Sequence, residues 1–115
     1  MKVLLIDDED FILNLLKEVV EMTGHTPVTA GKASEAEEVF SADPDIKTVF
    51  CDYTLPDNDG LALSTKLRSL RADSVIYLLT GWCHSYFDDK DITAINKIIT
   101  KPFDIQQIMA LLADG

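Results

Sequence analysis

The sequence predicts an α/β fold in which a five-stranded parallel sheet lies between two layers of helices. Two observations predict this doubly wound, three-layer sandwich. Short apolar runs alternate with amphipathic stretches along the 115 residues, and strands that alternate with helices build parallel sheets with right-handed crossovers. The apolar runs do not alternate with polar residues, as expected of strands that helices cover on both faces.

Five segments are the expected strands. Four of them are continuous apolar runs, at residues 3–6, 49–51, 75–79 and 98–99. The fifth, residues 27–30, is a weaker candidate and begins with Pro27. Proline has no N–H to donate to a neighbouring strand, so we expect this segment at an edge of the sheet.

The first expected helix covers residues 11–22 and has a wide apolar face. Its apolar residues recur at helical spacing and are Phe11, Ile12, Leu15, Leu16, Val19 and Met22. Asp8 or Asp10 is the expected N-terminal cap, and Gly24 is the expected stop signal.

The second and third expected helices carry capping signals. Residues 33–40 form the second helix, where Ser34 and Glu37 have the spacing of a capping box, with a cap one or two residues earlier as the alternative. The third helix follows Gly60 and is expected to be capped by Asp59. Its inward-facing residues are predicted to be Leu63, Leu67 and Leu70.

The last expected helix covers residues 105–112. Its inward face is predicted to be Ile105, Ile108, Met109 and Leu112. Before it, residues 83–96 hold three aspartates, three β-branched residues and no sustained apolar stripe. We therefore expect only a short helix there, near residues 92–96.

Composition limits the class of protein. The chain is 47% hydrophobic with 5 Gly and 4 Pro, which favours one globular domain over residues 1–115. Twenty acidic and ten basic residues give a net charge of −10. Such a surface repels phosphate backbones and anionic lipids, so we expect this domain itself to bind neither nucleic acid nor membranes.

The cysteines and the N-terminus point to a cytoplasmic protein. Cys51 and Cys83 lack the spacing of a zinc site, and both are expected to be reduced thiols, with Cys51 in the core. No apolar stretch approaches the roughly 18 residues that span a bilayer. The first residues resemble a strand, not a signal peptide, because carboxylates follow only four apolar residues.

Polar side chains follow the core strands where each strand ends. Asp7 and Asp8 follow the first run, Asp52 follows the second core run, and Thr80 follows the third. Lys101 follows the last run after one intervening residue, Thr100. Ligands in open α/β sheets bind beyond the carboxyl ends of the strands. We therefore expect these side chains to form one site.

The predicted site has the components of phosphoryl transfer. Three converging carboxylates repel one another unless one binds a proton or a cation lies among them. Oxygen ligands without histidine or cysteine favour Mg²⁺, with Mn²⁺ as a substitute. A carboxylate can attack phosphorus, and the transition state then needs ammonium and hydroxyl donors of the kind that Lys101 and Thr80 provide.

Each of these residues also has a structural interpretation when it is considered alone. Asp8 can cap the following helix, Lys101 can be a solvated surface lysine, and Thr80 can belong to a turn before Gly81. The combination of Asp7 with Asp8, Asp52 and Lys101 favours a functional site over these alternatives.

Four motifs in this order resemble the receiver domain of two-component response regulators. They are Ile6-Asp7-Asp8-Glu9, Asp52-Tyr53-Thr54-Leu55-Pro56-Asp57-Asn58-Asp59-Gly60, Thr80-Gly81 and Lys101-Pro102-Phe103. The resemblance covers essentially the whole chain. It implies a flavodoxin-like sheet with strand order 2-1-3-4-5 and a cis peptide bond between Lys101 and Pro102.

The resemblance also implies a role for each site residue. Asp52 would accept a phosphoryl group from a sensor histidine kinase or a histidine phosphotransfer protein. Asp8 would bind Mg²⁺ directly, Asp7 largely through water, and Thr54 through its backbone carbonyl. Lys101 and Thr80 would contact the phosphoryl oxygens. The implied chemistry is self-phosphorylation and self-dephosphorylation, so the protein would be a switch and not an enzyme with a separate substrate.

The sequence departs from the receiver pattern at two places. Ile98 replaces the usual Tyr or Phe three residues before the lysine. Residues 83–96, where the family has its fourth helix, lack the usual alanine-rich amphipathic pattern. An alternative function is therefore a degenerate receiver that serves as a constitutive protein-interaction module. A Mg²⁺-dependent phosphohydrolase is a further alternative, which the absence of a second carboxylate at Thr54 disfavours. We also expect Trp82 to hinder hydrolysis of the phosphorylated form.

The resemblance implies a downstream partner without identifying it. The signal would reach a separate protein or an output domain, because the chain is compatible with a free-standing receiver and with the front end of a longer protein. Phosphorylation could also drive formation of a dimer through the last two helices.

Overall fold

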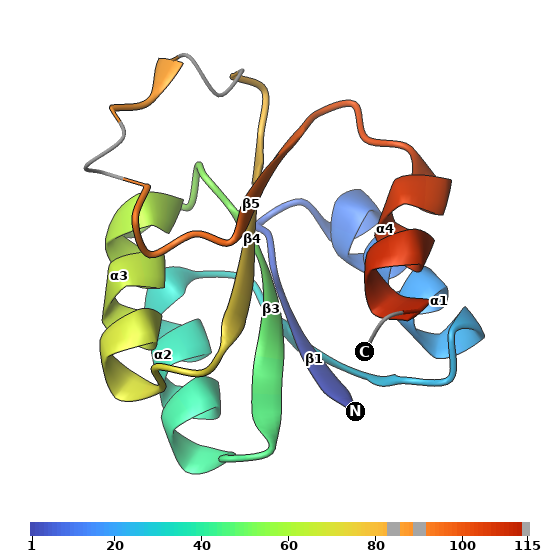
Figure 1. Ribbon diagram of the computed structural model, residues 1–115, viewed down its shortest axis with the longest axis horizontal. Helices are drawn as coiled ribbons and strands as arrows, with labels where there is room; N and C mark the ends of the chain where they lie inside the picture. Colours follow the sequence, from blue (N-terminus) through green and yellow to red (C-terminus); the bar gives the residue numbers. More distant parts are fainter. Residues whose placement is uncertain (83–85, 89–91, 114–115) are drawn as a thin grey trace.

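The computed structural model describes residues 1–82, 86–88 and 92–113 and confirms the predicted fold class (Figure 1). Its strands are β1 (Lys2–Ile6), β2 (Thr26–Ala30), β3 (Ile46–Asp52), β4 (Val75–Thr80) and β5 (Lys97–Thr100). They form a parallel sheet in the order β2-β1-β3-β4-β5, as the resemblance implies. Pro27 lies in the edge strand β2, as predicted.

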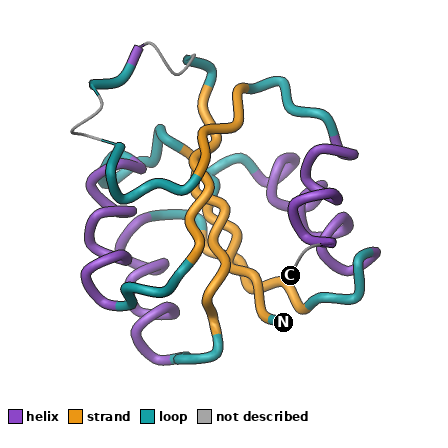
Figure 2. The backbone as a smooth tube through the Cα atoms, viewed as in Figure 1, coloured by secondary structure: helices purple, strands orange, loops and turns teal. Residues whose placement is uncertain are grey.

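Helices cover both faces of this sheet and make three layers. They are α1 (Asp10–Met22), α2 (Ala33–Ala42), α3 (Gly60–Leu70) and α4 (Ile105–Ala113). Figures 1 and 2 show α2 and α3 on one side of the strands and α1 and α4 on the other. No helix in the described ranges has the length and hydropathy to cross a bilayer.

Successive residues of each strand pack into two separate cores. In β1, Leu4 belongs to the cluster under α2 and α3, whereas Leu5 belongs to the cluster under α1 and α4. Side chains alternate between the faces of a strand, so both faces must be apolar for the helices to pack on them. A fully buried side chain of this kind contributes about 1.5–3 kcal/mol. The continuous apolar runs in the sequence are therefore a direct consequence of the three layers.

The predicted inward faces of the helices are wrong at four positions. Phe11, Met22, Leu70 and Ile105 are 76%, 70%, 47% and 39% exposed. In α1 the buried residues are Leu16, Val19 and Val20. At 3.6 residues per turn, Phe11 lies about 140° around the helix from Leu16, so the predicted spacing drifts off the buried face.

The helix starts also differ from the prediction. Neither Asp8 nor Asp10 caps α1, because its N-cap residue is Glu9, which makes no side-chain capping bond. The capping box at Ser34 does not form, and the N-cap residue of α2 is Lys32, two residues earlier, as in the alternative prediction, without a side-chain cap. Two predictions are confirmed. Asp59 Oδ1 accepts the Ala62 N–H at 2.8 Å, and Gly24 ends α1 with a φ of +84°.

In the described part of the connection from β4 to β5, residues 92–96 do not form the predicted short helix, and residues 92–94 form a turn. Residues 83–85 and 89–91, including Cys83, lie outside the described part of the chain. The Arg68 guanidinium holds the end of this connection by donating to the Ala94 carbonyl at 3.1 Å and to Asn96 Oδ1 at 2.6 Å.

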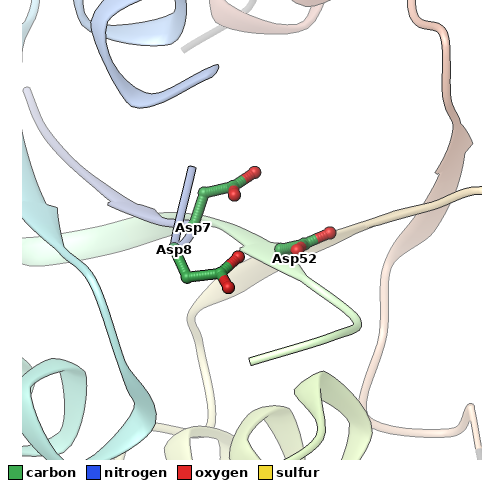
Figure 3. A group of neighbouring side chains, drawn as sticks. All are labelled: Asp7, Asp8 and Asp52. Atoms are coloured by element: carbon green, nitrogen blue, oxygen red, sulfur yellow. The ribbon is translucent and has the colours of Figure 1, made fainter. Parts of the chain in front are cut away.

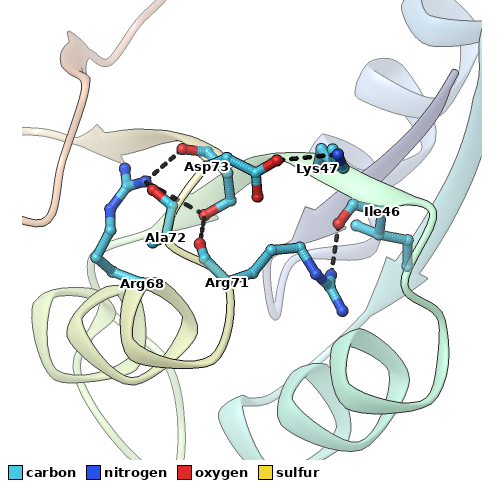
Figure 4. A network of polar contacts seen from close by, with 7 residues as sticks. Ile46, Lys47, Arg68, Arg71, Ala72 and Asp73 are labelled. Atoms are coloured by element: carbon cyan, nitrogen blue, oxygen red, sulfur yellow. Dashed lines mark hydrogen bonds and ion pairs between the residues drawn. The ribbon is translucent and has the colours of Figure 1, made fainter.

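A network of arginine contacts lies at the amino ends of β3 and β4 (Figure 4). Arg71 donates to the carbonyl oxygens of Phe40 and Ile46, and Arg68 donates to that of Ala72. The network ties the helices of one layer to the end of the sheet opposite the candidate site.

Candidate functional site

The register of the sheet brings the predicted acidic residues together. Ile6 pairs with Cys51, and Asp52 pairs with Leu79, so Asp7 and Asp52 lie at the same edge of adjacent strands. One carboxylate oxygen from each of Asp7, Asp8 and Asp52 lies within 4.8 Å of the others. Figure 3 shows the three side chains projecting toward the same side of the strand ends.

Asp7 is the most deeply buried member of this cluster, with no exposed surface. Its Oδ1 accepts the Glu9 N–H at 2.9 Å, and its Oδ2 lies 3.2 Å from Lys101 Nζ. A buried carboxylate is costly unless it is paired and hydrogen-bonded. These two contacts compensate the burial and fix the orientation of the carboxylate.

Asp52 shares the same ammonium group. Its Oδ1 lies 3.0 Å from Lys101 Nζ, and 6% of the residue is exposed. Burial raises the pKa of Asp52 to about 6, and the charge of Asp7 adds to this increase while the Lys101 hydrogen bond opposes it. A carboxylate in this range gives up its proton near neutral pH.

The pKa of Lys101 is raised as well, but in a lysine this shift favours the charged form. Burial by itself would lower the pKa of Lys101, but the hydrogen bond and charge of Asp52, together with Asp7, outweigh it and the pKa is raised. Lys101 therefore stays charged. One ammonium group faces three carboxylates, so the cluster keeps an excess of negative charge.

The donor set of the cluster fits a hard divalent cation. All three candidate side-chain ligands are carboxylates, and Asp8 is exposed while its two neighbours are buried. Mg²⁺ typically takes one or two carboxylates and keeps several waters, which matches a cluster that opens to solvent on the Asp8 side.

The loop after β3 packs tightly against the backbone of Asp52. Gly60 donates its N–H to the Tyr53 carbonyl at 2.6 Å, and Thr54 pairs with Asp59 in an isolated antiparallel bridge. A Cβ on Gly60 would lie 2.3 Å from the Asp52 carbonyl oxygen. Only glycine fits there, which fixes the course of the loop that carries Thr54.

Thr80 ends β4 at the same edge of the sheet and is buried. It comes one residue after Leu79, the partner of Asp52. Its Oγ1 accepts the Trp82 N–H at 3.1 Å. Trp82 is 51% exposed and stacks on Tyr86 with ring centroids 4.7 Å apart. Its effect on hydrolysis stays a prediction.

Two further features lie near the site, a cis peptide bond and a loop aspartate that contacts α2. The Lys101–Pro102 peptide bond is cis, as the resemblance implies. Asp57 lies in the loop between β3 and α3, and its two carboxylate oxygens accept the N–H groups of Ala33 and Ser34. The hydrogen bond from the Ser34 N–H makes the largest contribution, followed by that from the Ala33 N–H, and both hold the pKa of Asp57 below its usual range. The signal that could have revealed this contact is Lys32, a poor N-cap residue that leaves the start of α2 without a local cap.

An apolar groove of about 460 Å³ lies beside the acidic cluster. Phe11 from α1 and Phe103 from the β5–α4 loop line it, and Lys101 reaches it from the cluster. The groove accounts for the exposed position of Phe11, which faces this opening instead of the core.

Comparison with known proteins gives a consistent result. The family described as "Response regulator receiver domain" matches residues 3–113. Chemotaxis protein CheY of Halobacterium salinarum is 30% identical over 115 residues, which cover 98% of this chain and 94% of that protein. Transcriptional regulatory protein PhoP of Escherichia coli is 34% identical over 113 residues, which cover 96% of this chain. The chain spans about half of the length of PhoP, 49%.

Solved structures share the fold. Response regulator TrrA from Thermotoga maritima, crystallised in complex with Mg²⁺–BeF, has a TM-score of 0.88 and 27% identity, covering 98% of this chain and 96% of that one. A receiver domain protein from Clostridium thermocellum also has a TM-score of 0.88, at 21% identity, covering 98% of this chain and 91% of that one. The second likeness concerns the fold alone.

Proposed function

Because the chain belongs to the response regulator receiver domain family, we propose that it is a signalling switch that accepts a phosphoryl group on Asp52. One observation carries the proposal. Asp52 lies at the end of a core strand with its Oδ1 3.0 Å from Lys101 Nζ, inside a cluster of three carboxylates. A helix cap or a surface ion pair needs no such convergence of charge.

The cation of the proposed switch is Mg²⁺, which Mn²⁺ can replace. Asp7, Asp8 and Asp52 would hold it through carboxylate oxygens, with Asp7 acting largely through water and Thr54 contributing its backbone carbonyl. When bound, the ion supplies positive charge that offsets the carboxylates and the phosphoryl oxygens. The all-oxygen donor set and the excess negative charge of the cluster support this choice.

The residues of the chain have distinct parts in the proposed transfer. An oxygen of the Asp52 carboxylate attacks phosphorus while the bond from phosphorus to the donor's histidine nitrogen breaks. The imidazole leaves with the electron pair and takes up a proton. Lys101 keeps its charge beside both Asp7 and Asp52, so it can pair with a phosphoryl oxygen without moving far.

The Thr80 hydroxyl is the proposed link from phosphorylation to conformation. It accepts the Trp82 N–H at the end of β4, and it can instead donate its proton to a phosphoryl oxygen. Turning the hydroxyl toward Asp52 would release Trp82 and shift the population of the segment that follows. A downstream protein or an output domain would bind the shifted form.

The direct test is phosphorylation by acetyl phosphate and Mg²⁺, followed by mass spectrometry of the intact protein. We expect one phosphoryl group on the wild-type chain and none on Asp52→Asn. Asp45→Asn is the matched control, because this exposed acid precedes the opposite end of the same strand, and it should be phosphorylated like wild type.

Two results would contradict the proposal. Phosphorylation of Asp52→Asn would place the acceptor elsewhere. A wild-type chain that stays unmodified and shows no change in Trp82 fluorescence with Mg²⁺ and beryllofluoride would favour the constitutive interaction module.

The groove beside the cluster is where we expect the phosphodonor protein to dock. A histidine kinase or phosphotransfer protein must bring its phosphohistidine to the strand ends, and Phe11 lies 76% exposed in the adjacent groove. We expect Phe11→Ala to lower kcat/KM for transfer from such a donor about tenfold, the scale of an exposed aromatic anchor. Phosphorylation by acetyl phosphate should not change.

Met22→Ala is the control for this prediction. Met22 is equally apolar, 70% exposed, and lies at the other end of α1. Equal losses in both variants, or no loss in Phe11→Ala, would move the docking surface away from this groove.

A further inference from the structure

Asp57 joins two parts of the chain that lie more than twenty residues apart. Its Oδ1 accepts the Ala33 N–H at 2.8 Å, and its Oδ2 accepts the Ser34 N–H at 3.0 Å. The first N–H groups of a helix have no partners within the helix and carry positive partial charge. The two oxygens therefore fasten the β3–α3 loop to the start of α2.

The two parts that Asp57 joins lead to different members of the acidic cluster. On the α2 side, the preceding strand β2 ends at Ala30, whose carbonyl accepts the Asp7 N–H at 3.2 Å. On the loop side, Asp57 follows Thr54 by three residues and Asp52 by five. The Asp57 bridge thus connects the backbone that carries Asp7 with the backbone that carries Asp52.

The same loop is anchored from its other end by α3. Asp59 Oδ1 accepts the Ala62 N–H at 2.8 Å, and Gly60 donates its N–H to the Tyr53 carbonyl at 2.6 Å. These contacts hold the loop against its own following helix. Asp57 adds an anchor toward β1 and β2, so Thr54 lies between two fixed points.

We propose that Asp57 is a positioning residue for the divalent cation, because it holds the Thr54 segment at the spacing from Asp7 and Asp8 that binding requires. The proposal rests on the proposed function, since it concerns the same cation site. Asp57 would not be a ligand itself, because both of its carboxylate oxygens already accept N–H groups at the start of α2. It acts by limiting the positions that the loop can take before binding, which reduces the entropy lost when the ligands close on the ion.

The expected size of the effect on Mg²⁺ affinity follows from the indirect way in which Asp57 acts on the cation site. Changes in groups that orient metal ligands typically weaken metal binding about 10- to 100-fold. Asp57 orients a stretch of backbone and not a ligand side chain, so we expect about a five- to tenfold loss, at or just below the lower limit of this range.

A residue that only stabilised α2 would behave differently. Loss of a helix cap lowers the free energy of unfolding, but the molecules that stay folded would bind Mg²⁺ with unchanged affinity. Glu35 provides the matched control. Its Oε1 accepts the Gly31 N–H at 2.7 Å at the same end of α2, but Glu35 belongs to α2 itself and makes no bridge to the β3–α3 loop through this bond.

The experiment compares wild type with Asp57→Ala, Asp57→Asn and Glu35→Ala. MgCl₂ is titrated into each ¹⁵N-labelled protein and followed by NMR, while urea unfolding reports stability. We expect a five- to tenfold higher dissociation constant for Asp57→Ala. Asp57→Asn, with one remaining acceptor oxygen, should be intermediate, and Glu35→Ala should stay within twofold of wild type. At saturating Mg²⁺, acetyl phosphate should modify Asp57→Ala at the wild-type rate.

Three results would overturn the proposal. An Asp57→Ala dissociation constant within twofold of wild type removes the role of Asp57 and leaves the proposed function intact. An equal increase in Glu35→Ala would reduce the effect to general loosening of α2. A wild-type protein that binds no Mg²⁺ would overturn both this role and the proposed cation site.

Discussion

Lys101 is the residue on which the electrostatics of the cluster depend. Its ammonium lies 3.2 Å from Asp7 Oδ2 and 3.0 Å from Asp52 Oδ1, so a single positive charge compensates two buried carboxylates. The pKa of Asp52 rises to about 6 despite this contact, because burial outweighs it. The unphosphorylated site therefore costs the folded protein stability.

Asp52→Asn should stabilise the protein in metal-free buffer at pH 7.5 by about 1–2 kcal/mol, less than the roughly 2.7 kcal/mol that two pKa units are worth. A carboxyl group whose pKa is raised in the fold favours folding while protonated. Its penalty appears as the pH rises above the unfolded value near 4 and is complete above about 6. Urea unfolding of both proteins between pH 4.5 and 7.5 measures the difference.

Saturating Mg²⁺ supplies the control for this prediction. Because the cation would pair with the Asp52 carboxylate, the wild type should gain more stability from Mg²⁺ than Asp52→Asn. A difference between the two proteins that does not change with pH would show that the Asp52 charge carries no cost.

At the scale of the secondary-structure elements, the junction of β3 and α3 has no room for a side chain at Gly60. Gly60 lies where a Cβ would come within 2.3 Å of the Asp52 carbonyl oxygen and 2.8 Å of the Tyr53 Cα. Both are backbone atoms, so the strain cannot be relieved by turning a side chain. The start of α3 and the end of β3 therefore lie in direct backbone contact, and a change in one requires a shift in the other.

Gly60→Ala should lower the free energy of unfolding by about 1–3 kcal/mol, the usual cost of overpacking, and should slow phosphorylation by acetyl phosphate because Asp52 is displaced. Gly31→Ala is the control, since nothing lies within 4 Å of a Cβ added there. If the two variants unfold at the same urea concentration, the close approach at Gly60 is not a constraint on the fold.

Arg68 stabilises the end of the connection from β4 to β5. Its guanidinium donates to the Ala94 carbonyl and to Asn96 Oδ1, and Asn96 Oδ1 also accepts the Ile76 N–H at 2.8 Å. One arginine of α3 thus holds the end of the β4–β5 connection against the start of β4.

Arg68→Met should lower the free energy of unfolding by about 1–3 kcal/mol, because partly buried acceptors such as the Ala94 carbonyl lose a charged donor. Hydrogen exchange of the Ile76 amide should become faster in the variant, as measured by NMR. Lys66→Met, an exposed change on the same helix, should leave both quantities unchanged. An unaltered Ile76 amide in Arg68→Met would show that Asn96 holds its position without the arginine.

At the scale of the whole molecule, two cores on opposite faces hold the site at one end of the sheet. The strand ends that carry Asp7, Asp52 and Thr80 are each preceded by fully buried residues. The arginine network lies at the opposite end (Figure 4). The arginine network and the acidic cluster therefore lie at opposite ends of the same strands.

The sequence by itself determined the fold class, the strand positions and the membership of the acidic cluster. Apolar runs without alternation leave a doubly covered parallel sheet as the arrangement that buries them, and parallel strands bring their carboxyl ends to one edge. Asp7, Asp8, Asp52, Thr80 and Lys101 could be recognised because each follows such a run. These features depend on local order along the chain, which a sequence shows directly.

Only the tertiary structure decided the contacts between distant segments. That Phe11 faces a groove and that Asp57 caps α2 depend on how helices pack on the sheet, because the angle of a helix and the path of a loop are set by neighbours far away in the sequence. The pKa of Asp52 also depends on its burial and on the charges of Lys101 and Asp7, which come from distant parts of the chain. The sequence identifies the residues of the site, whereas packing sets the distances between them and the pKa of Asp52.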